Sequence, residues 1–157
     1  MNAAFLALAV ALSAYAPDAG IVQSGSTVRV DVPAVLVFTV SNVAQPTVVT
    51  GFRLSYNQAK LGSGQALRVS VKGEGTLTIG GVSVPISNIT WTTSQAVNGT
   101  GMNGALSAAA YTPVYDSKVN PSTGRVDLAW SLTLPAGITT AGSGQITLRW
   151  KFEAIVP

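Results

Sequence analysis

The sequence predicts an all-β protein, an antiparallel β-sandwich of the immunoglobulin-like or jelly-roll-like kind with an apolar N-terminal extension. Three observations predict it. After residue 20, large apolar residues alternate with polar ones in short runs, which is the period of a half-buried strand. Turn-forming Gly, Pro and Asn residues separate these runs. No helical stripe of useful length appears in the same region.

The composition indicates one domain that depends on packing alone. The chain has 157 residues, no Cys and no His, and 10% of its residues are charged. A chain of this length buries a sizeable core without disulfides. We expect an apolar segment and linker over residues 1–20 and a β-sandwich domain over residues 21–157.

The N-terminal segment alternates large and small residues. Leu6, Leu8, Val10 and Leu12 are separated by Ala7, Ala9 and Ala11. This period of two favours a strand that inserts its large side chains into a neighbouring subunit, where main-chain hydrogen bonds add affinity.

Two other interpretations of residues 1–16 stay open. A secretory signal peptide would end at the small-x-small site formed by Ala14 and Ala16, although a basic n-region is missing. The Ala and Leu content also favours a packed helix at the core of a filament. In each case so long an apolar stretch has to be buried in an interface or a membrane.

The first half of the domain predicts a series of strands after an expected linker at Pro17–Gly20. The run at 35–40, VLVFTV, is apolar on both faces, which predicts a strand at the centre of the sandwich. Gly80 and Gly81 are expected to form a turn. The other strands are expected at 28–32, 52–56, 67–71 and 77–79.

The last third carries the clearest pattern. Residues 126–134 and 146–152 each place large apolar residues on one face, with Trp130 and Trp150 among them. A turn-rich stretch at 135–144 joins them, so we expect the two strands to pair antiparallel and to anchor the core. Residues 98–121 are less regular.

The charged residues predict no catalytic or nucleic-acid-binding site. Asp127 and Glu153 alternate with core residues and should face solvent, and Asp116 is expected in a loop, so no facing pair of carboxylates is predicted. Without His the serines form no ordinary triad. The nine basic residues are scattered singly, unlike a nucleic-acid footprint. We expect no catalytic residues, no metal, no cofactor and no small-molecule substrate, and hence no enzyme.

Two motifs and three aromatic residues remain as candidate surface features. Asn88 and Asn98 each begin an Asn-x-Thr triplet, the acceptor pattern for N-glycosylation. Trp91, Tyr111 and Tyr115 fall outside the clearest core patterns, so they are the candidates for an exposed aromatic row.

The chain resembles filament subunits that are completed by a donated strand: archaeal bundling pilins, the biofilm matrix filament protein TasA and, more loosely, chaperone–usher pilins. Residues 6–12, 126–134 and 146–152 carry the resemblance, which is architectural. The absence of Cys favours the archaeal or TasA-like branch. The resemblance implies an extracellular filament at the cell surface, serving adhesion or biofilm formation. The implied partners are further copies of the chain and host or neighbouring cell surfaces.

Two alternative functions are left open by the sequence. One is a secreted β-sandwich that binds a carbohydrate or a surface partner after residues 1–16 are removed. The other is a capsid or spike protein of a virus, since such proteins also bury edges between identical copies.

Overall fold

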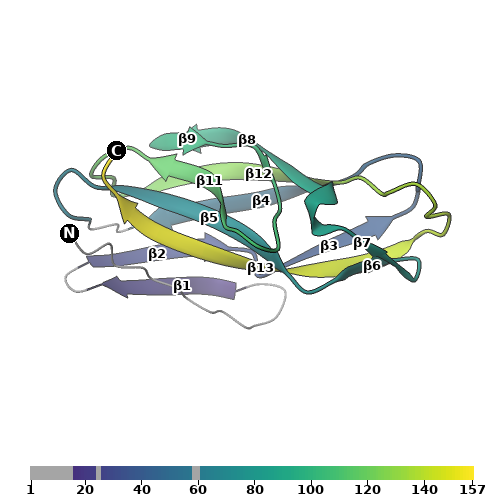
Figure 1. Ribbon diagram of the computed structural model, residues 1–157. Coiled ribbons are helices and arrows are strands. Elements are labelled where there is room, and N and C mark those ends of the chain that lie inside the picture. The colour runs from purple at the N-terminus through teal and green to yellow at the C-terminus, as the bar shows by residue number, and fades with distance from the viewer. Residues whose placement is uncertain (1–15, 24–25, 58–60) are drawn as a thin grey trace.

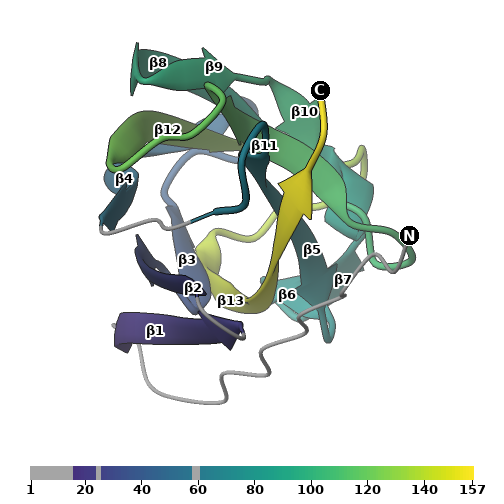
Figure 2. The ribbon, with the colours of Figure 1, turned by 90° about the vertical axis from the view of Figure 1, so that its left-hand side faces the viewer.

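The computed structural model describes residues 16–23, 26–57 and 61–157. It confirms the predicted all-β fold: two curled antiparallel sheets pack face to face (Figures 1 and 2). The six-stranded sheet contains, in spatial order, β1 (Ala16–Gln23), β2 (Ser26–Val32), β4 (Thr47–Asn57), β12 (Gly124–Leu132), β8 (Ile89–Val97) and β10 (Gly104–Ala105).

The five-stranded sheet lies across the core from the first. It contains, in spatial order, β3 (Val35–Val40), β13 (Gly142–Ile155), β5 (Ala66–Glu74), β11 (Thr112–Ser117) and β9 (Gly99–Gly101). A small hairpin of β6 (Leu77–Ile79) and β7 (Val82–Val84) and one 3-10 turn, Ile86–Asn88, complete the fold. Within the described part of the chain, no helix is long and apolar enough to cross a membrane.

The core between the sheets is built on large aromatic residues. Trp91 and Trp130 lie opposite each other on β8 and β12, with ring centroids 5.4 Å apart and planes tilted by 56°. The Trp91 indole N–H donates to the carbonyl of Met102 at 2.8 Å. Gly104 lies beside Trp91 on β10, and a Cβ there would come within 2.6 Å of the indole ring. Glycine is therefore required at this position so that the ring can be buried.

One sequence-based expectation about pairing is wrong. The strands around Trp130 and Trp150 were expected to pair with each other, but β12 belongs to the six-stranded sheet and β13 to the five-stranded sheet. Residues 133–141 connect β12 to β13 and so take the chain from one sheet to the other. Both strands anchor the core as expected, since Trp130 is fully buried and Trp150 is 5% exposed, but they do so from opposite sides.

Two other elements differ from the sequence-based expectation. The apolar run Val35–Val40 forms β3, which is an edge strand rather than a central one. Its even-numbered residues are buried, whereas Val37 is 46% exposed. Residues 17–20, expected as a linker, lie within β1. Periodicity reports which face of a strand is buried, but it does not report which strands lie beside it.

A bulge in β4 places two apolar residues on the core face. Trp130 pairs with Val49 and Leu128 pairs with Phe52, so two residues of β4 stand opposite one of β12. Gly51 takes a positive φ of 87° at this point. Val49 and Phe52 consequently both point toward the core, although an even and an odd position would otherwise face opposite ways.

Leu54→Ala tests the assignment of the core. Leu54 is fully buried on β4, so the substitution is expected to lower the free energy of unfolding by about 2–5 kcal/mol. The matched control is Val48→Ala on the same strand, where the side chain is 59% exposed and a change within about 0.5 kcal/mol is expected. Urea unfolding measures both, and equal effects would contradict the assigned faces of β4.

Candidate subunit interface

One side of the sandwich has two strand edges that no described strand pairs with. β3 is the last strand of its sheet. On the facing sheet, β2 pairs only with Ser55–Asn57 of β4, which leaves residues 47–53 without a partner from the described chain on that side. We call β3 and residues 47–53 of β4 together the open side.

The main-chain groups of β3 alternate between its paired and its open edge. The N–H of Leu148 on β13 donates to the carbonyl of Ala34 at 2.8 Å, in register with the β3–β13 pairing. Because main-chain groups alternate in an antiparallel ladder, Val35, Val37 and Thr39 direct their N–H and C=O groups toward the open side. No described strand pairs with these groups, and an edge of this kind can accept another strand.

Apolar side chains line the open side. Val43, Val49 and Phe52 pack against the core but remain only partly buried. Val37 and Val48 flank the two edges, and they are two of the six exposed large apolar side chains in the described part of the protein. The sequence from residue 32 to residue 52 contains no charged residue. The open side therefore combines an apolar surface with main-chain groups that no described strand pairs with.

The other sheet edges are protected. β9 has three residues and β10 has two, so neither offers a long template. Next to β10, the side-chain Oδ1 of Asn103 accepts hydrogen bonds from the N–H of Thr93 at 2.8 Å and from its Oγ1 at 3.1 Å. The β1 edge carries Pro17 and Asp18. Short length, proline and charge are all ways of blocking edge pairing, and β3 has none of them.

The predicted donor residues lie outside the described residues. These are Leu6, Leu8, Val10 and Leu12. The sequence predicted a donor segment but no edge to accept it, because residues 35–40 were expected at the centre of the sandwich. The uncharged run of residues 32–52 was the available signal, since an edge strand in a monomer ordinarily carries a charge or a proline.

The acidic residues on the outer faces of the sheets are neutralised by basic neighbours. Arg53 binds Asp127 through two hydrogen bonds of 2.6 and 2.9 Å, and these bonds lower the pKa of the Asp127 carboxyl. Arg149 contacts Glu74 and lowers its pKa in the same way. Asp127 and Glu153 lie on the outer faces, as predicted. No group of three acidic residues in the described part of the chain could hold a metal ion.

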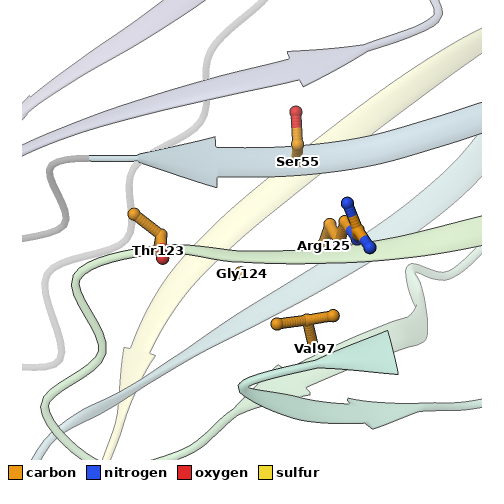
Figure 3. A pocket seen from close by; sticks show the side chains of 5 residues that line it. All are labelled: Ser55, Val97, Thr123, Gly124 and Arg125. Atoms are coloured by element: carbon orange, nitrogen blue, oxygen red, sulfur yellow. The ribbon is translucent and has the colours of Figure 1, made fainter. Parts of the chain in front are cut away.

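A shallow depression of about 370 Å³ lies on the outer face of the six-stranded sheet (Figure 3). Arg125 on β12 lies opposite Ser55 on β4 and opposite Val97 on β8. Thr123 and Gly124 complete the lining. The lining brings together one guanidinium and two hydroxyls but no carboxylate, so it does not supply a pair of groups for acid–base chemistry.

The three candidate aromatic residues do not form an exposed row. Trp91 is 1% exposed and Tyr115 is fully buried. The Tyr115 hydroxyl donates to the carbonyl of Val97 at 2.7 Å, and burial raises the pKa of this phenol well above its usual range. Tyr111 is partly buried, with the ammonium groups of Lys72 and Lys151 at 5.2 and 5.9 Å from its ring centroid. Two of the three rings thus belong to the core, and the third is covered by cations.

The two candidate glycosylation residues both use their amide nitrogens within the fold. Asn88 donates through Nδ2 to the carbonyl of Thr133 at 2.8 Å and is partly buried. Asn98 is exposed in the turn between β8 and β9, with a positive φ of 56°, and donates to the carbonyl of Thr123 at 2.8 Å. Both assignments remain predictions, and Asn98 is the more accessible residue.

Comparisons with known proteins return no match. Neither the protein-family models, nor the curated proteins, nor the solved structures match this chain. The geometry of the open side and the sequence of the N-terminal segment are therefore the features that bear on function.

Asn103→Ala tests whether this side chain protects the β8 edge. The substitution removes the acceptor of the Thr93 N–H, and the free energy of unfolding is expected to fall by about 1 kcal/mol. Asn103→Asp keeps an acceptor oxygen and serves as the control. Urea unfolding of both variants measures the effect, and an unchanged Asn103→Ala midpoint would show that water replaces the bond without cost.

Proposed function

We propose that this protein is the structural subunit of an extracellular pilus or filament, and that it polymerises by insertion of its N-terminal segment into the neighbouring copy. The filament would serve adhesion or biofilm formation at the cell surface. The observation that carries the proposal is the open side, where an apolar edge strand and partly buried core residues lie next to main-chain groups without a partner among the described strands.

The N-terminal segment has the chemistry that such a surface would accept. Leu6, Leu8, Val10 and Leu12 fall on one face of an extended strand, and alanines occupy the other face. On the open side, main-chain hydrogen bonds to β3 would fix the strand, and its large residues would face the core beside Val49 and Phe52. Burial of each large side chain contributes about 1.5–3 kcal/mol, so four of them make a durable contact.

The surface and the segment are both uncharged, which supports a homopolymer. Residues 1–17 contain no Asp, Glu, Lys or Arg, and neither do residues 32–52. A contact between the two segments buries no unpaired charge, whose desolvation would otherwise oppose assembly. The paired charges of Arg53, Asp127, Glu74 and Arg149 lie on the outer faces of the sheets, away from the core.

Leu8→Asp tests the proposal. The variant would have to bury a carboxylate on the core face of the donated strand, so assembly is expected to be lost while the sandwich stays folded. Ala9→Asp is the matched control, because it adds the same charge at the next residue on the solvent-facing side and should still assemble. Negative-stain microscopy and light scattering of the full-length variants measure assembly, and circular dichroism measures folding.

Two outcomes would contradict the proposal. Normal filaments from Leu8→Asp would mean that the large face of the segment is not buried in the contact. A wild-type chain that stays monomeric at all concentrations would favour the secreted binding module instead.

A further inference from the structure

β2 and β3 follow each other along one edge of the sandwich, but they belong to different sheets. β2 pairs with β4 in the six-stranded sheet, the chain passes through Pro33 and Ala34, and β3 then pairs with β13 in the five-stranded sheet. The indole N–H of Trp150 donates to the carbonyl of Pro33 at 2.6 Å, which holds the crossing point against β13.

β1 covers the first half of this edge and leaves the second half open. It pairs antiparallel with β2 from Gln23 opposite Ser26 to Ala16 opposite Val32. Ala16, the first residue of β1, therefore lies at the end of β2, next to the point where β3 begins; Figure 1 shows this end of β1 near the start of β3. A chain that continued straight from β1 would run along β3 in the antiparallel direction.

We propose that in the free subunit residues 8–13 continue β1 and pair with β3 of the same chain, so that the segment covers its own open side before assembly. This inference rests on the proposed function, since it states where the polymerising segment lies before it is exchanged for the segment of a second copy.

The pairing at the first residue of β1 supports the proposal. The register of β1 against β2 shifts by one residue between Ala19 and Ala16. When the pairing of Ala16 with Val32, beyond this shift, is continued one residue back for each residue forward, large apolar residues of the two strands stand opposite each other: Leu12 with Leu36, Val10 with Phe38 and Leu8 with Val40. Directly opposite residues of an antiparallel pair point to the same face. Leu36, Phe38 and Val40 face the core, and so would their partners.

The alternation of large and small residues favours this parity over the opposite one. Continuing the register places Ala11 opposite Val37 and Ala9 opposite Thr39, both of which are exposed. A slip by one residue would turn the alanines inward and the leucines outward, so the alternation specifies this register. The six residues 8–13 match the six residues of β3, a length of about 20 Å.

Such an arrangement would protect the subunit before assembly. An uncovered apolar edge strand pairs indiscriminately with other edges. Because the segment is held beside the start of β3 through β1, its effective concentration at the β3 edge of its own chain is high. During assembly, the segment of a neighbouring copy would have to compete with it for this edge.

A cysteine pair tests the proposal in the full-length chain, which contains no native Cys. Ala11→Cys with Val37→Cys places the two thiols on directly opposite residues, whose Cα atoms are about 5.5 Å apart in an antiparallel pair, within the range of a disulfide. The control is Ala11→Cys with Val82→Cys, because Val82 is also an exposed strand valine, 44% exposed, but lies on β7.

The chains are oxidised at low protein concentration, and the products are separated by mass under non-reducing conditions. We expect the Val37 pair to form an intramolecular disulfide in a species of monomer mass, at least about tenfold faster than the control pair, because the tethered thiols have a high effective concentration. Equal rates for the two pairs, or free thiols that persist in the monomer, would overturn the inference.

The same samples separate this inference from the proposed function. If the Ala11→Cys, Val37→Cys variant forms filaments in which every disulfide joins two different copies, the proposed function is supported. The proposed pairing of residues 8–13 with β3 of the same chain is then overturned. An intramolecular disulfide in a chain that forms no filaments even after reduction would support the arrangement and overturn the function. Loss of assembly in the locked chain, restored by reduction, would support both.

Discussion

The crossing of the chain at Pro33 and Ala34 is the constraint on which the rest of the structure depends. Proline has no N–H to give to a ladder, so β2 ends there, and the chain moves to the other sheet. Two hydrogen bonds from β13 hold the crossing: Trp150 Nε1 to the Pro33 carbonyl and the Leu148 N–H to the Ala34 carbonyl. Because the edge strand is divided between the sheets, residues 47–53 of β4 have no neighbour on one side among the described strands, and β3 is the last described strand of its sheet.

The packing of the core explains why this edge remains apolar. Leu36, Phe38 and Val40 lie within the core and are at most 2% exposed, so half of β3 has to be large and hydrophobic whatever lies beside it. The other half is not required to be apolar by the core, yet Val35 and Val37 occupy it. An edge strand that is apolar on both faces favours aggregation of an isolated molecule. In an interface, a partner strand pairs with the same edge and buries its apolar side chains.

The balanced charges on the outer faces of the two sheets agree with the proposed assembly of copies through the uncharged open side. Acidic residues on the outer faces are matched by basic neighbours, as in the bidentate pairs of Arg53 with Asp127 and of Arg68 with Asp116. Exposed pairs of this kind contribute little stability, but they leave the faces without a strong net field. The stability of the protein comes instead from its buried aromatic and aliphatic side chains, and in the proposed filament the same kind of burial would join one copy to the next.

The sequence by itself determined the all-β fold, most of the strand positions and, among the described residues, the buried face of the strands that alternate regularly. Alternation at 126–132 and 146–152 placed Trp130 and Trp150 in the core, and the parity of a strand depends only on its own residues. The tertiary structure alone decided which strands lie side by side. It separated β12 from β13, moved residues 35–40 from the expected centre to an edge, and turned both Val49 and Phe52 inward through the bulge at Gly51. Which strands are neighbours in a sheet depends on contacts between residues far apart in the chain. Local periodicity gives no information about those contacts.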